Sequence, residues 1–215
     1  PSCGQRRAIA WAERMVTEVL PDVPYLQVVF TIPKMLRKHF LFDRALYGEL
    51  SKVAYAATRE FFAAQFPTIE GAVPGMIVAP QSFGNLLNPH AHLHAVSSLG
   101  VFDPEGTFHA APGDLDFRAL GELFRERTLQ MRLKRDAITA ERVELLRSWQ
   151  HSGFNLNTTR RVAAGDRQSL ETLLQYIERP PVSLRRLTYR DDGMVHYQGN
   201  RFHPGLGRDH QLVSG

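Results

Sequence analysis

Three histidines stand at alternate positions in the segment Asn88-Pro-His-Ala-His-Leu-His-Ala-Val96. In an extended strand, side chains two residues apart lie on one face, so His90, His92 and His94 should point the same way, each about 7 Å from the next. Imidazole binds divalent metals and titrates near neutral pH. The segment therefore predicts a strand face that binds a metal ion or a phosphate. The alternative is a set of ordinary core or surface histidines.

A tyrosine in the later segment 169–178 is the second residue whose position indicates chemistry. The apolar residues of that segment form one helical face: Leu170, Leu173, Leu174 and Ile177. Tyr176 lies well away from the centre of this face, so the helix can dock through its leucines while the phenol projects sideways. Phenols become good nucleophiles when a base or cation favours the phenolate, and Arg179, Arg185 and Arg186 follow closely. The alternative is an amphipathic tyrosine at a helix end.

The elements that must position these residues are helices interleaved with short strands. Helical spacing predicts helices at 5–20, 43–66, 114–150 (two helices) and 169–178. Strands are predicted at 25–32, 76–83, 91–101, 106–110 (closing a hairpin with the histidine strand) and 154–162, and a hairpin joins 187–189 to 195–197 around Asp191-Asp-Gly193. The fold class is α+β or α/β, with α+β preferred: an antiparallel or mixed sheet carries the histidine strand and helices pack on it.

Composition sets limits on the class of protein. The chain has 215 residues, of which 43% are hydrophobic, enough for one good core. It carries 26 Lys and Arg against 22 Asp and Glu, a net charge of +4, which permits a polyanionic partner. No stretch approaches the roughly 20 apolar residues that cross a bilayer, and no signal-peptide pattern is seen. The single cysteine, Cys3, excludes an internal disulfide framework. These features predict a cytoplasmic protein without a membrane partner.

Taken together, these segments resemble a known family. A histidine–hydrophobic–histidine strand followed by a helical tyrosine is the plan of the HUH endonucleases, and the details are similar to the rolling-circle transposases of the insertion sequence 91 type. The matching segments are Cys3-Gly-Gln-Arg-Arg7, Val29-Phe-Thr-Ile-Pro33, Gln81-Ser-Phe-Gly84, Asn88-Pro-His-Ala-His-Leu-His94, Ser152-Gly-Phe154 and Tyr176-Ile-Glu-Arg-Pro-Pro181. The resemblance runs in this order from about residue 1 to residue 198 and stops beyond Asn200.

The resemblance implies a domain organisation. Residues 1–20 would be the remnant of an upstream zinc-binding module, ending in Cys3, together with a helix. Residues 21–200 would form the HUH catalytic domain, and residues 201–215, polar and bearing Gly and Pro, a poorly ordered tail. The chain would thus be shorter than the family at both ends.

The resemblance also implies site residues. His92 and His94 match the metal-binding pair, Tyr176 matches the nucleophile, and Gln81 is the expected third metal ligand. Some relatives have a second tyrosine four residues earlier, where this chain has Thr172, which implies a one-tyrosine enzyme. DNA-binding roles are expected for basic or polar residues near these groups: His90, Lys34, Arg160, Arg161 and Arg179.

The implied activity is cleavage and transfer of single-stranded DNA at transposon ends in a bacterial, nucleoid-associated protein. A divalent ion, Mg²⁺ or Mn²⁺, would polarise the scissile phosphate, and Tyr176 would form a 5′-phosphotyrosine. The oligomeric state is left open.

Two other functions remain open. In histidine-triad nucleotidyl hydrolases or transferases, the string from His90 to Val96 also occurs, and His92 would be the nucleophile without any metal. That function leaves Ser152-Gly-Phe154 and the segment from Tyr176 without a role. The other possibility is a catalytically inactive, DNA-binding remnant of a transposase.

Overall fold

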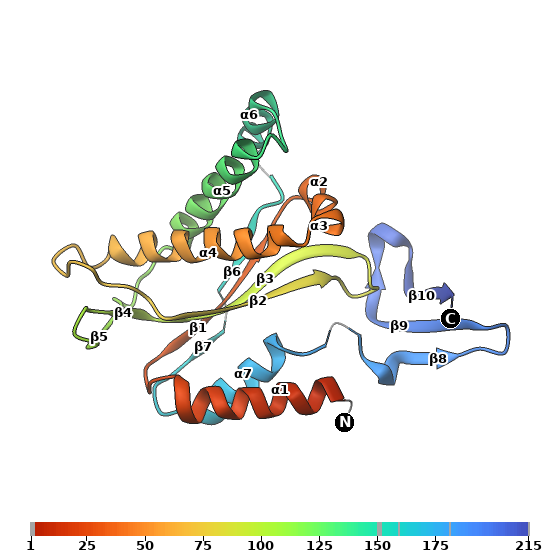
Figure 1. The fold of residues 1–215 in the computed structure, drawn as a ribbon, viewed down its shortest axis with the longest axis horizontal. Coiled ribbons are helices and arrows are strands. Elements are labelled where there is room, and N and C mark those ends of the chain that lie inside the picture. Colours follow the sequence, from red (N-terminus) through yellow and green to blue (C-terminus); the bar gives the residue numbers. More distant parts are fainter. Residues whose placement is uncertain (1–2, 150–151, 159, 181, 215) are drawn as a thin grey trace.

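The computed structural model describes residues 3–149, 152–158, 160–180 and 182–214. Its central feature is an antiparallel sheet with strand order β2-β3-β1-β6, in which β7 also pairs with β1, and helices cover both faces (Figure 1). A separate three-stranded sheet and a two-strand ladder complete the fold. The predicted α+β class with an antiparallel sheet flanked by helices is confirmed.

Three strands carry the candidate site: β1 (Tyr25–Thr31), β2 (Met76–Phe83) and β3 (Pro89–Ser98). β3 is central and pairs antiparallel with both neighbours. In this register His92 lies opposite Thr31 of β1 and Gln81 of β2. Cross-strand partners share a face of the sheet, so the pairing itself places these side chains together.

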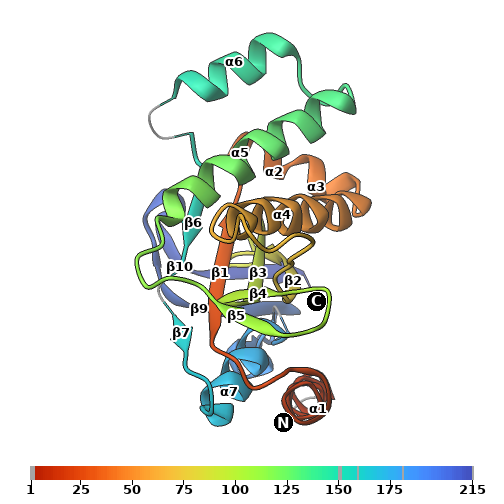
Figure 2. The same ribbon diagram turned by 90° about the vertical axis from the view of Figure 1, so that its left-hand side faces the viewer.

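One face of the sheet packs on the larger core. The helices on this side are α2 (Lys34–Arg37), α3 (His39–Phe42), α4 (Ala45–Ala63), α5 (Phe117–Lys134) and α6 (Ala140–Ser148). Phe30 of β1 meets Phe124 of α5 with ring centroids 4.7 Å apart, and Leu93 of β3 is fully buried in the same core. Figure 2 shows α4 and α5 stacked over the sheet, with α6 lying beyond α5.

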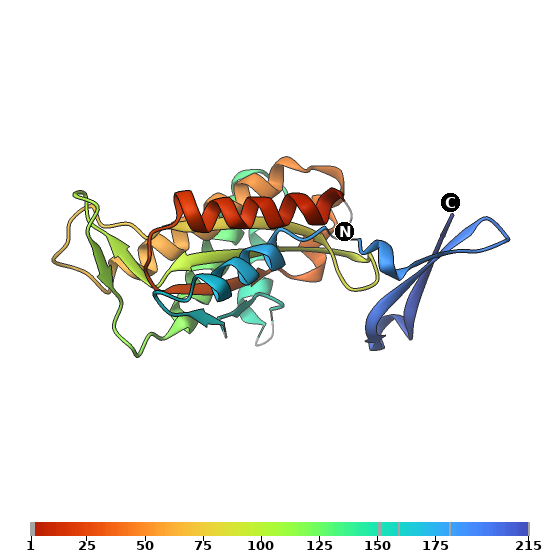
Figure 3. The same ribbon diagram turned by 90° about the horizontal axis from the view of Figure 1, so that it is seen from below.

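The other face is covered by two helices that lie side by side in Figure 3, α1 (Cys3–Arg14) and α7 (Arg167–Ile177). A π-helical turn, Met15–Val19, extends α1. Ala12 and Val16 pack with the leucines of α7 and with Val96 in one core. The sequence sets residues 1–20 apart from residues 21–200; in the structure the helix within residues 1–20 shares a core with α7 and β3.

The C-terminal segment forms the three-stranded sheet, with order β10-β9-β8. A 3-10 turn (Leu184–Arg186) leads into β8 (Leu187–Tyr189), which pairs with β9 (Met194–His203) in the predicted hairpin. Residues 201–214, for which the sequence predicts a poorly ordered tail, lie mostly in strands. They complete β9 and form β10 (Arg208–Ser214), because backbone pairing with β9 satisfies their polar groups despite the polar sequence.

Two predicted strands are each divided. The predicted strand 91–101 becomes β3 and β4 (Gly100–Phe102), and β4 rather than β3 pairs with β5 (Phe108–Ala110). The predicted strand 154–162 becomes β6 (Asn155–Asn157) and β7 (Arg161–Val162), both paired with β1. Between β3 and β4, the N–H of Leu99 donates to the carbonyl of Pro24, outside the two strands.

The Ser152-Gly-Phe154 motif has a structural explanation. Gly153 adopts a left-handed φ of +82°, and a Cβ there would lie 3.1 Å from Pro33 Cα. Phe154 packs its ring edge-on against Phe124, with centroids 6.1 Å apart. The motif therefore packs the residues just before β6 against Pro33, which follows β1.

Replacing Gly153 by Ala should destabilise the fold more than replacing Gly165. Both glycines have φ of +82°, which costs a residue with a Cβ about 1–2 kcal/mol. Only Gly153 adds a close contact, because nothing lies within 4 Å of a Cβ at Gly165. Urea unfolding of Gly153→Ala and Gly165→Ala measures the difference. Equal losses in the two variants would show that contact with Pro33 is unimportant.

Candidate active site

Alternation along β3 separates the site from the core. Leu93 and Ala95 face α4 and α5, whereas the three histidines face α7. The rings of His90 and His92 stack with centroids 4.7 Å apart, and those of His92 and His94 meet edge-on at 5.0 Å. The predicted common face of the three imidazoles is present. Val96, the next residue on this face, is buried in the core beneath α7.

Two of these imidazoles have the geometry of a ligand pair. The Nε2 atoms of His92 and His94 lie 3.2 Å apart. Nδ1 of His92 lies 2.7 Å from the carbonyl oxygen of His90, so Nδ1–H donates to it and Nε2 keeps its lone pair. A histidine ligand commonly donates its other N–H to such a carbonyl. The pair fits a metal ion of which both Nε2 atoms would be ligands.

Gln27 of β1 lies behind the second member of the pair. Its Nε2 is 3.4 Å from Nδ1 of His94. With the amide N–H donating to Nδ1, His94 carries its proton on Nε2 and donates it to Nε2 of His92. Turning the amide over would place its oxygen against Nδ1–H and leave Nε2 of His94 free to bind a metal. Gln27 was not singled out by the sequence, because only the pairing of β1 with β3 brings it to His94.

The imidazoles are neutral at physiological pH. Burial lowers the pKa of His90 to about 4, and the Arg37 guanidinium adds to this effect. Burial also lowers the pKa of His94 to about 4, with contributions from His92 and Arg179. For His92 burial lowers the pKa too, although its hydrogen bond to the His90 carbonyl opposes the shift. Neutral rings keep the lone pairs that metal binding requires.

Tyr176 lies beside this pair. Its ring meets the ring of His94 edge-on, with centroids 5.5 Å apart, and its side chain is 36% exposed. The guanidinium of Arg179, one turn onward, lies over the tyrosine ring at 4.2 Å from its centroid. One turn earlier, the hydroxyl of Thr172 donates to the Gln168 carbonyl. A single phenol therefore faces the histidines from α7.

Gln81 connects the histidine sheet to α7. Its Nε2 donates to the carbonyl oxygen of Ile177, at 3.0 Å, immediately after Tyr176 in the chain. It lies opposite His92 in the β2–β3 register, on the same face. Because this bond uses only an N–H of the amide, the amide oxygen remains available as a metal ligand.

A cavity of about 520 Å³ encloses these groups. Among the described residues that line it there is no Asp or Glu, whereas three arginines contribute to it: Arg179, Arg186 and Arg201. No ion pair recorded in the described ranges involves any of the three. Such a basic, carboxylate-free cavity suits a phosphate group.

The residues predicted to bind DNA divide into two groups. His90 and Arg179 line the cavity, and Lys34, exposed at the start of α2, is close enough to contribute to lowering the pKa of His90. Arg160 and Arg161 do not line it. Arg161 lies opposite Leu26 of β1, on the other face of the sheet, with its guanidinium 6.0 Å from the Phe117 ring centroid.

The sequence missed the contribution of the C-terminal sheet. Asn85, in the β2–β3 turn, donates from Nδ2 to the Arg201 carbonyl and accepts from the Asn200 N–H. A Cβ at Gly199 would lie 2.5 Å from Cδ2 of Leu86 and 2.7 Å from the backbone oxygen of Asp209, so this close approach requires glycine. These contacts place Arg201 at the cavity, and no local pattern in the sequence indicates them.

Comparisons with known proteins identify a family to which the chain is similar. The family described as "Putative transposase" matches residues 75–212, which corrects the expectation that the resemblance ends at Asn200. The chain is 26% identical over 215 residues to the "Transposase for insertion sequence element IS801" of Pseudomonas savastanoi pv. phaseolicola, covering 90% of this chain and 48% of the relative. It is 31% identical over 222 residues to "Putative transposase y4qJ" of Sinorhizobium fredii (strain NBRC 101917 / NGR234), covering 95% and 55%.

The chain thus spans about half the length of the curated relatives it matches. No solved structure matches it. Within the described residues, no helix combines the length and the apolar character needed to span a membrane.

The lowered histidine pKa values predict an acid-sensitive fold. His90 and His94 take up a proton near pH 6.5 in the unfolded chain but only near pH 4 in the folded chain. The free energy of unfolding therefore falls as the pH drops from 6.5 toward 4. Replacing both His90 and His94 by Gln should make this fall smaller. Denaturant unfolding in EDTA across this range measures it, with His196→Gln in β9 as control. An unchanged pH dependence in the double variant would contradict the prediction.

Proposed function

The chain belongs to this transposase family, and we propose that it cuts and rejoins single-stranded DNA through Tyr176, assisted by a divalent metal ion at His92 and His94. The observation that carries the proposal is the edge-on contact of Tyr176 with His94 inside a basic cavity. A nucleophile, a metal-binding pair and phosphate-binding arginines are the parts that a tyrosine strand transfer needs.

The cleavage step follows from the positions of these groups. The scissile phosphate would lie between the Nε2 atoms of the histidine pair and Oη of Tyr176. Oη forms a bond to phosphorus, the bond from phosphorus to the 3′ oxygen breaks, the phenolic proton passes to solvent, and the departing oxygen takes up a proton. Arg179, which lies over the ring and lines the cavity, would bind an oxygen of the scissile phosphate. The products are a free 3′-hydroxyl and a 5′-phosphotyrosine.

Rejoining is the reverse of this step. A 3′-hydroxyl attacks the phosphotyrosine, the new phosphodiester forms, and the phenol is released. Because Thr172 occupies the position one turn before Tyr176, one phenol serves both steps. This favours sequential cleavage and joining at one residue over alternation between two phosphotyrosines.

A bound divalent ion would polarise the phosphorus–oxygen bonds and neutralise the charge that builds on the phosphate. His92 and His94 would hold it, with the amide oxygen of Gln81 as the third protein ligand. No carboxylate lines the cavity in the described parts of the chain, so the phosphate itself would balance the metal charge. Two imidazoles suit Mn²⁺ better than Mg²⁺, which prefers oxygen ligands.

The covalent intermediate gives the direct test. Randomised single-stranded oligonucleotides are incubated with the protein and Mn²⁺, and denaturant-resistant adducts are separated on gels. DNA labelled at its 3′ end should remain attached, whereas 5′-labelled DNA should not. Tyr176→Phe should abolish the adduct, because it removes Oη. Tyr189→Phe, at an exposed tyrosine of β8 outside the cavity, is the matched control.

Each other outcome selects another function. Adducts carrying the 5′ label, or persisting in Tyr176→Phe, would exclude this chemistry. DNA binding without any adduct would favour the inactive remnant. Nucleotide hydrolysis that survives EDTA and requires His92 would favour the histidine-triad alternative.

Metal affinity should depend to different degrees on the three expected ligands and on Gln27, which supports one of them. His92→Ala or His94→Ala should weaken Mn²⁺ binding on the order of 100-fold, and Gln81→Ala or Gln27→Ala roughly 10-fold, in line with the losses seen when metal-site residues and their supports are removed. Titration calorimetry of the DNA-free protein gives these affinities. His109→Ala, at the β5 histidine paired with Asp103, is the control. Unaltered Mn²⁺ binding by both histidine variants would move the metal site elsewhere.

A further inference from the structure

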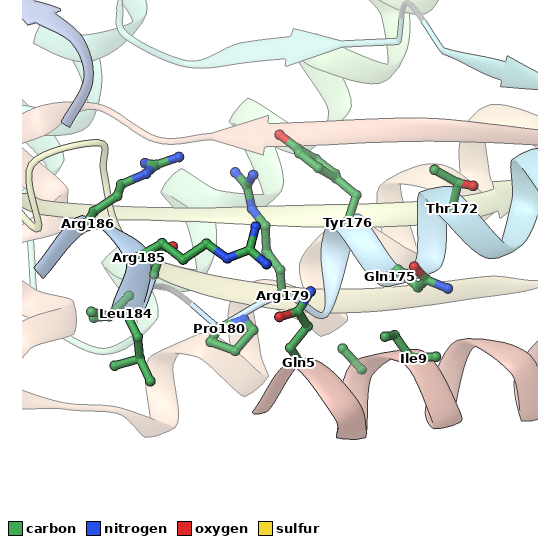
Figure 4. A pocket seen from close by; sticks show the side chains of 13 residues that line it. Gln5, Ile9, Thr172, Gln175, Tyr176, Arg179, Pro180, Leu184, Arg185 and Arg186 are labelled. Atoms are coloured by element: carbon green, nitrogen blue, oxygen red, sulfur yellow. The ribbon is translucent and has the colours of Figure 1, made fainter. Parts of the chain in front are cut away.

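A second cavity, of about 590 Å³, lies beside Tyr176 and Arg179. Its walls come from α1, from the same helix α7 and from the segment that follows it (Figure 4). Tyr176, Arg179 and Arg186 line both this cavity and the histidine cavity, so the two meet at the tyrosine. The geometry of the proposed cleavage step uses only the first of them.

The second cavity combines positive charge with apolar surface. Arg185 lines only this cavity, and Figure 4 shows its side chain reaching toward Arg179. Ile9 of α1 and Leu184 are exposed apolar side chains in its wall, at 39% and 63%. No Asp or Glu is among the described residues lining it. A guanidinium beside exposed apolar surface suits a nucleotide, whose phosphate binds arginine while its base contacts apolar side chains.

An amide group adds a means of distinguishing bases. Gln175 of α7 lines the cavity and donates from Nε2 to Glu171, which leaves its amide oxygen as an acceptor. Figure 4 shows this amide between Tyr176 and Ile9. A base placed against Ile9 would have its polar edge near this amide.

The geometry of in-line attack indicates which nucleotide of the substrate the second cavity would bind. The departing 3′ oxygen lies on the side of phosphorus opposite Oη of Tyr176, so the released strand leads away from the tyrosine. The strand that stays attached leaves phosphorus through its equatorial 5′ oxygen, at roughly 90° to the line of attack, so it can turn into the second cavity beside Tyr176. We propose that this cavity binds the first nucleotide of the DNA end that remains linked to Tyr176, with Arg185 on its next phosphate. This inference rests on the proposed function.

The test uses one variant that removes a positive charge from the second cavity and another that fills its volume. Arg185→Ala deletes the phosphate contact, and Ile9→Trp fills the cavity; both positions are exposed, so folding should be retained. Arg59→Ala, an exposed arginine of α4 on the far face of the sheet, is the charge control. Substrates are built around the cleavage sequence recovered from wild-type adducts and are shortened by single nucleotides at either end.

Arg185→Ala should lower the rate of adduct formation about ten-fold, the size expected for one charged hydrogen bond. The loss should appear only with substrates that retain nucleotides 3′ to the cleavage site, and Arg185→Lys should restore part of it. Ile9→Trp should weaken the base preference at the first of those positions. Equal rates and preferences in wild type, Arg185→Ala and Ile9→Trp would overturn the inference and leave the proposed function standing.

If wild-type protein forms no adduct, the proposed function fails, and fluorescence anisotropy with the same randomised oligonucleotides judges the cavity alone. Weaker binding by Arg185→Ala and Ile9→Trp than by Arg59→Ala would then keep a nucleotide site. Equal binding by all three variants would overturn it.

Discussion

The hydrogen bond from Gln81 to the carbonyl of Ile177, together with the leucine face of α7, fixes the position of Tyr176 relative to the histidines. The helix buries Leu173, Leu174 and Ile177 against the sheet, so its rotation about its own axis is set by packing. A rotation of one residue, about 100°, would bury the phenol or turn it away from His94. The site therefore depends on the docking of one short helix.

The sheet contributes the second constraint. Because β3 lies between β1 and β2, residues from three strands converge on His92 and His94 without any loop. Residues on strands are held more firmly than residues on loops, and strand pairing also supplies Gln27 and Gln81 as supports. The same burial that holds the imidazoles lowers their pKa values, which keeps them neutral. Burial thus determines both the position and the protonation state of the imidazoles.

The charged side chains around Tyr176 are all positive among the described residues that line the two cavities. The described residues lining both cavities include arginines and no carboxylates, although the chain carries 22 Asp and Glu. Elsewhere arginines pair with acids, as Arg127 does with Glu60 and Arg135 with Asp43. The arginines beside Tyr176, which form no ion pair with an acid among the described residues, attract phosphate groups.

The sequence by itself determined the histidine strand, the apolar face of the tyrosine helix and the α+β class, because alternation and helical spacing are local properties of the chain. It also indicated the family, through the order of its motifs. Only the tertiary structure decided that Gln27 supports His94, that Arg161 lies on the opposite face, and that Arg201 reaches the cavity while its segment forms a strand. These outcomes depend on which strands pair and in which register, and pairing joins residues far apart in the chain, so no local pattern records it.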